Sequence, residues 1–207
     1  MMKLISFQHK SVLDKLNRDG IYECSTLSKF HESTPKCYNE LSKRLNLREN
    51  ISPVFAWYNV NGLPLEINSD SIGRALEMTG CDTTKYYLFE LNVPDEYVDL
   101  QYFYNFVDMR CVEEFDDNVC ITWYNVFNVD RNDNDNEIQA TLPFIKREWI
   151  KNIYEVTYEQ ITKEFDSSIL NMDYCKEHNL QIPKTAVSWE VTNINKLNCI
   201  SKKMELF

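Results

Sequence analysis

The residues best suited to chemistry lie in the stretch NEIQATLPFIKREWIKNIYEV, residues 136–156. Residues 138–142 are predicted to form a strand, in which alternation places Glu137, Gln139 and Thr141 on one face. A carboxylate and an amide could point together into a cleft. In a transferase that breaks an N-glycosidic bond, the carboxylate stabilises an oxocarbenium-like transition state and holds a ribose hydroxyl. Glu137 and Gln139 are therefore candidate catalytic residues. The alternative is a solvent-exposed Glu137 and a Gln139 that bonds a neighbouring loop.

A second candidate group is basic. Lys43, Arg44 and Arg48 are close enough in sequence to form a local groove, although such a cluster on a helix also fits an ordinary solvated face. The whole chain has 22 basic and 32 acidic side chains and a formal net charge of −10, a balance that repels a phosphate backbone. Non-specific nucleic-acid binding is therefore not expected. An acidic surface suits a basic protein partner, and its candidate residues are Glu113, Glu114, Asp116 and Asp117.

Metal binding is not expected. In DRNDNDNEIQAT, residues 130–141, acidic and amide side chains alternate as in a calcium loop, but Asp135 stands where the sharp turn needs glycine. Thr141 stands where a bidentate glutamate is needed. The three histidines have no spacing typical of zinc ligands. The sequence also contains no GxGxxG, P-loop or GxSxG motif, so dinucleotide-binding Rossmann folds, Walker-type NTPases and α/β-hydrolases are not indicated.

Length and cysteine usage indicate one reduced, cytoplasmic domain. A chain of 207 residues with 43% hydrophobic residues can form one sizeable core. Its seven cysteines contain no CxxC pair, which is typical of thiols that stay reduced. No stretch is apolar enough for a membrane span or a secretory leader.

The elements that must position the candidate residues form an α+β pattern. We predict a single domain with a mixed, mostly antiparallel sheet flanked by helices: residues 1–156 form the domain, and residues 157–207 form an extension docked on the same core. Periodicity and capping residues predict strands at 4–7, 53–60, 86–93, 138–142, 153–156 and 186–191. The same signals predict helices at 11–20, 34–45, 71–80, 99–110, 158–165 and 172–178, with a turn or short helix at 147–149. Residues 119–129 fit either a strand or a capped helix.

The order of several segments resembles a mainly bacterial family known as domain of unknown function 3841 (DUF3841). The matching segments cover most of residues 3–156; they are LISFQ, CYNELSKRL, PVFAWY, LFELNVPDEYVDL, ITWYNVF and EIQATLPFIKREWI. The resemblance implies that ITWYNVF forms a short helix before the strand containing IQA. It implies no activity.

A weaker resemblance is to ADP-ribosyltransferases, especially the DNA-targeting toxin type. In that family the final catalytic strand carries a Gln-Ala-Glu run before a proline and an isoleucine step; here Gln139 and Ala140 match, and Thr141 replaces the catalytic glutamate. The start is also similar, with a strand that ends in Ser6 and Gln8, a short helix, and then a glycine.

The transferase resemblance implies an NAD-binding domain that modifies a macromolecular target. Ser6 and Gln8 would hold the nucleotide, Arg44 a phosphate and Glu137 the ribose. This reading requires the first strand and the strand at 138–142 to lie side by side and to share a cleft. The competing hypothesis is a non-catalytic cytoplasmic interaction protein whose acidic surface binds a basic partner.

Overall fold

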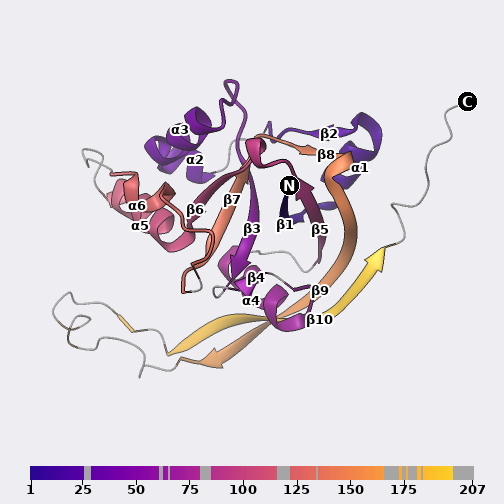
Figure 1. Ribbon diagram of the computed structural model, residues 1–207. Helices are drawn as coiled ribbons and strands as arrows, with labels where there is room; N and C mark the ends of the chain where they lie inside the picture. The colour runs from indigo at the N-terminus through magenta and orange to yellow at the C-terminus, as the bar shows by residue number, and fades with distance from the viewer. Residues whose placement is uncertain are drawn as a thin grey trace, which may run out of the picture.

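The main sheet contains eight strands and is antiparallel at every pairing between described strands (Figure 1). The computed structural model describes residues 1–25, 29–60, 63–64, 66–79, 85–115, 122–133, 135–165, 173, 176, 181–182 and 184–197. Seven strands lie in the order β10-β9-β5-β1-β3-β7-β6, and β4 pairs with β3. Their bounds are β1 Met2–Gln8, β3 Val54–Val60, β4 Leu63–Pro64, β5 Lys85–Val93, β6 Asp99–Tyr102, β7 Ile138–Leu142, β9 Ile150–Glu164 and β10 Thr185–Leu197. The predicted α+β fold with a mostly antiparallel sheet is confirmed.

Helices cover both faces of this sheet, and a small second sheet pairs β2 (Ile21–Tyr22) with β8 (Ile145–Lys146). The helices are α1 Lys10–Asp19, α2 Lys29–Ser33, α3 Pro35–Arg44, α4 Ser69–Thr79, α5 Phe103–Phe115 and α6 Tyr124–Phe127, with 3₁₀ turns η1 Asp95–Tyr97 and η2 Arg147–Trp149. Among the described residues, no helix is long and apolar enough to cross a membrane.

Strand alternation divides the core between the two faces. On one face, Leu4, Ala56 and Phe89 pack against α1. On the other face, Ile5 and Trp57 pack against α4. A third cluster on the second face joins the sheet to α3, α5 and α6; its buried residues are Cys37, Leu41, Phe106 and Val126, with Phe55 packed against them. Because both faces are buried, β3 reads in the sequence as a nearly continuous apolar run.

The first helix ends as the sequence predicts and begins slightly earlier. Gly20 adopts φ 73°, the left-handed conformation that glycine tolerates best, and its N–H donates to the carbonyl oxygen of Leu16. The N-cap is His9 rather than Ser11, because the His9 imidazole accepts a hydrogen bond from the Ser11 backbone N–H. The turn after Gly20 leads directly into β2.

Two predicted helices are wrong in part or in full. Residues 99–102 form β6 and pair with β7, and helix α5 begins only at Phe103. The segment 158–165 is not a helix, because residues through Glu164 continue β9 and pair with β10. The apolar spacing in both segments fits a helix, but long-range strand pairing determines the backbone.

The C-terminal strands are longer than predicted. β9 extends the predicted strand at 153–156 to Ile150–Glu164, and β10 extends that at 186–191 to Thr185–Leu197. β9 thus runs through the proposed boundary at residue 156, and the division into domain and extension stays a prediction. The short helix expected within 119–129 is present as α6, while residues 119–121 lie outside the described residues. The helix at 172–178 lies outside them too, apart from residues 173 and 176.

Glu113 corrects the predicted acidic surface. Its side chain is 2% exposed, and its carboxylate accepts hydrogen bonds from the backbone N–H groups of Lys36 (2.6 Å) and Cys37 (2.9 Å). These are donors at the N-terminus of α3, where a negative charge is favourable and where Thr34 makes no side-chain cap. Glu113 therefore joins α5 to α3 and does not face a partner. Glu114 is exposed, and Asp116 and Asp117 lie outside the described residues.

Removal of the Glu113 cap should destabilise the fold. Glu113→Ala leaves two helix N–H groups without their acceptor and should lower the free energy of unfolding by about 1–3 kcal/mol. The matched control is Glu114→Ala, at an exposed neighbouring position, with an expected effect of about 0.5 kcal/mol or less. Urea denaturation measures both, and equal effects would contradict the capping role.

Candidate functional site

The sheet has a weak join between β1 and β3. In the described residues these two strands share one register pair, Ile5 with Trp57, whereas β1 and β5 pair along seven residues. β3 is also irregular on its other side, where the register with β7 shifts between Trp57 and Asn59. Hollows lie on both sides of the Ile5–Trp57 pair, with volumes of about 220 Å³ and about 720 Å³.

Ser6 strengthens this join, and Gln8 bonds to Ser6. The Ser6 hydroxyl is fully buried and donates to the carbonyl oxygen of Phe55 in β3 at 2.7 Å. Gln8 donates from Nε2 to Ser6 Oγ at 2.8 Å. The Ser6 side chain thus connects the two strands just beyond their last paired residues, where the backbone ladder has ended, and Gln8 bonds to Ser6 within β1.

Gln139 lies opposite Gln101 in the β6–β7 ladder. Gln101 Nε2 donates to Gln139 Oε1 at 2.8 Å, and both side chains are buried. Gln139 also pairs with Trp57 on the other side, so it shares a face of the sheet with Trp57 and Ile5. Gln101 was missed by the sequence prediction because residues 99–110 were assigned to a helix.

The expected side-by-side arrangement of the first strand and the 138–142 strand is wrong, because β3 lies between β1 and β7. Ser6 and Gln8 also alternate to the face opposite Gln139. Even so, Gln8 at the end of β1 and Gln139 both line the smaller hollow. This amide hollow is named for those two side chains; its other lining residues are Phe7, Tyr22, Cys24, Pro53, Val54, Phe55 and Trp57.

The amide hollow is mainly aromatic and apolar apart from its two amides. Burial, followed by a hydrogen bond with Cys24, raises the pKa of Tyr22 well above its usual range, so this phenol stays neutral at physiological pH. A volume of about 220 Å³ is below the range of about 300–1,000 Å³ typical of pockets for drug-sized ligands. The amide hollow therefore has room for one planar ring and its substituent.

Glu137 does not line the amide hollow. Glu137 is buried, and its Oε1 atom lies 3.6 Å from Nη2 of Arg74 in α4. The Glu137 backbone carbonyl accepts from the Phe103 N–H at the start of α5. Glu137 thus connects β7 to two helices, and Arg74 offsets its charge.

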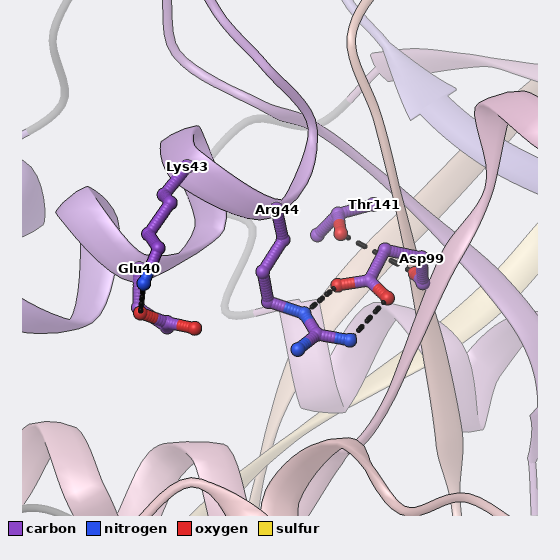
Figure 2. Close-up of polar contacts among 5 residues, drawn as sticks. All are labelled: Glu40, Lys43, Arg44, Asp99 and Thr141. Atoms are coloured by element: carbon purple, nitrogen blue, oxygen red, sulfur yellow. Dashed lines mark hydrogen bonds and ion pairs between the residues drawn. The ribbon is translucent and has the colours of Figure 1, made fainter.

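Arg44 lies in a different part of the molecule (Figure 2). Its guanidinium forms a two-pronged ion pair with Asp99 at the start of β6, through Nε to Oδ2 and through Nη2 to Oδ1 at 2.8 Å. This hydrogen bonding raises the pKa of Arg44. Its Cζ atom also lies 4.0 Å from the centroid of the Phe127 ring. A phosphate at Arg44 would therefore compete with Asp99.

Thr141 occupies the position of the transferase glutamate and is fully buried. Its hydroxyl donates to the Asp99 carbonyl oxygen at 3.3 Å, beside the Arg44 ion pair (Figure 2). Thr141 and Gln139 therefore make side-chain contacts to the same neighbouring strand, β6, two residues apart. This likeness makes Thr141 a useful control position.

Three charged groups that line the 720 Å³ hollow already have partners: Glu90, Asp95 and Arg131. Glu90 accepts from Asn152 Nδ2 at 2.6 Å and lies 3.6 Å from Lys151 Nζ, and Asp95 pairs with Arg131. Within the described residues, no group of three or more His, Cys, Asp or Glu side chains is arranged to hold a metal ion. The described cysteines Cys24, Cys37 and Cys111 form no disulfide.

The Arg44–Asp99 pair should stabilise the fold. A double-mutant cycle with Arg44→Met and Asp99→Asn should give a coupling energy of about 1 kcal/mol, because the geometry is bidentate but both groups are partly exposed. Urea denaturation of the two single variants and the double variant measures it. A coupling energy of zero would mean that Asp99 does not hold Arg44.

Comparison of this chain with protein-family models, curated proteins and solved structures found no match. The resemblances to DUF3841 and to ADP-ribosyltransferases therefore stay predictions.

Proposed function

We propose that this protein binds NAD, or a nucleotide with a similar planar amide-bearing ring, and that the ring enters the amide hollow. One observation carries the proposal: Gln8 and Gln139, singled out from opposite ends of the sequence, line the same aromatic hollow. Aromatic walls favour a flat ring, and a few polar groups fix its orientation. The small volume suits the nicotinamide end of the dinucleotide, with the rest outside.

The proposal does not include the ADP-ribosyl transfer that the resemblance implies. That chemistry needs a carboxylate beside the reacting ribose. Glu137 pairs with Arg74 and is not among the residues that line the hollow, and position 141 carries a threonine. The proposal is therefore limited to ligand binding. The competing hypothesis is an interaction protein with an acidic surface. Glu113 is buried and is therefore not part of that surface, and no contact among the described residues supports the hypothesis.

NAD should raise the thermal stability of the protein. At a concentration of one hundred times its dissociation constant, NAD should add about 2.7 kcal/mol to the free energy of unfolding. Gln139→Leu should abolish most of the shift, because it removes one of the two amides in the hollow. The control Thr141→Val removes a buried side-chain contact to the same strand outside the hollow and should keep the shift. An unchanged melting temperature of the natural protein at millimolar NAD would overturn the proposal.

Cys24 provides an independent readout because it lines the hollow and is half-buried. NAD should slow alkylation of Cys24 by iodoacetamide, measured by peptide mass spectrometry. Cys111 is exposed and serves as the internal reference, whose rate should not change. Cys37 should react slowly with or without NAD, because burial raises the pKa of its thiol. Equal alkylation of Cys24 in both conditions would place the ligand elsewhere.

A further inference from the structure

We propose that Gln101 and Ser6 are positioning residues that fix the hydrogen-bonding polarity of the amide hollow, so that it selects a carboxamide over a carboxylate. Gln139 then presents a donor and Gln8 an acceptor. This inference rests on the proposed function and deepens it, because it specifies which chemical group the bound ring carries. Neither Gln101 nor Ser6 lines the hollow, so both act through a neighbouring side chain.

The Gln101 contact sets the orientation of the Gln139 amide. Gln101 Nε2 donates to Gln139 Oε1, which leaves the Gln139 NH₂ group as the end not engaged by Gln101. No described residue accepts a hydrogen bond from that group, and Gln139 is 8% exposed. The Gln139 side chain therefore offers the hollow an N–H donor.

The reverse orientation of the amide pair is less favourable. Oε1 of Gln101 is buried and has no hydrogen-bond partner among the described residues. If both amides were turned, the buried group without a partner would be the Gln101 NH₂. Buried N–H groups without partners are rarer in proteins than buried carbonyl oxygens without partners. The buried Gln101 Oε1, without a partner in the described part of the chain, lowers the stability of the fold. We infer that this residue is retained because it orients Gln139.

The hydrogen bonds of Ser6 determine the orientation of the Gln8 amide. A serine hydroxyl has one hydrogen, and Ser6 donates it to the carbonyl oxygen of Phe55. Ser6 Oγ can therefore only accept from Gln8, so Gln8 must approach it with Nε2. Its Oε1 is then the end not bonded to Ser6. Gln8 offers the hollow an acceptor.

One donor and one acceptor match a ring substituent that carries both, which is the pattern of a primary carboxamide. A carboxylate carries acceptors alone, so it would bring negative oxygen toward Gln8 Oε1 and leave that group without a donor. The carboxamide makes about one hydrogen bond more than the carboxylate. Its dissociation constant should therefore be about tenfold lower.

The test is the ratio of the dissociation constants of NAD and of its nicotinic acid analogue, measured by isothermal titration calorimetry. The natural protein should bind NAD about tenfold more tightly. Ser6→Ala releases Gln8, which can then turn its NH₂ group toward a carboxylate, so the ratio should fall to about two or below. Gln8→Leu should lower the ratio in the same way and lies at a strand end, outside the buried core, so it covers the case in which Ser6→Ala does not fold.

Gln101→Leu should weaken NAD binding about three- to tenfold, because Gln139 loses its fixed orientation. Thr141→Val, at the matched position on β7, should keep both the affinity and the ratio. A natural protein that binds both dinucleotides equally, or Ser6 and Gln8 variants that keep the preference, would overturn this inference and leave the proposed function standing. A natural protein that binds neither dinucleotide would overturn both.

Discussion

The pairing of Ile5 with Trp57 connects the two halves of the main sheet. On one side lie β1, β5, β9 and β10, and on the other lie β3, β4, β7 and β6. A single register pair gives few backbone hydrogen bonds, so the connection depends on side chains. Ile5 and Trp57 are buried, Trp57 packs on Phe103 at 5.0 Å between ring centroids, and Ser6 reaches the Phe55 carbonyl. The amide hollow lies beyond this pair, where no further register pair among the described residues joins the two strands.

The irregular backbone of β3 explains several polar residues that a sequence pattern cannot interpret. Asn59 is buried, and its Oδ1 accepts the Ile138 N–H at 2.7 Å where the register between β3 and β7 shifts. Ser6 supplies a similar replacement on the other side of the strand. Both side chains satisfy backbone groups that a regular ladder would satisfy. Ser6 therefore has a structural function whether or not a ligand binds near Gln8.

The sequence predicts most of the elements but not the strand order. The positions of β3, β5, β7 and α1 follow from local sequence patterns. Each has a strong apolar pattern and a clear end, such as Gly20 after α1. In the β9–β10 hairpin, residues 157–164 and 192–197 were not predicted as strand, since pairing between residues far apart in sequence overrides local helical spacing. Gln8 and Gln139 were found from sequence. Gln101 and Tyr22 were not, because strand pairing brings them to the site.

Three polar residues on one face of the 137–141 segment are the types that a catalytic site would use. Their contacts show that they differ in function. Glu137 pairs with Arg74 from α4, and Thr141 donates to the Asp99 backbone. Each of these contacts joins β7 to another element and is satisfied within the protein. Gln139 uses its oxygen for Gln101 and keeps its NH₂ group beside a hollow. Alternation in the sequence makes the three residues equivalent, whereas their hydrogen bonds leave one of them available to a ligand. Glu137 and Thr141 therefore join β7 to neighbouring elements, and Gln139 is the one of the three residues to which the proposed ligand contact belongs.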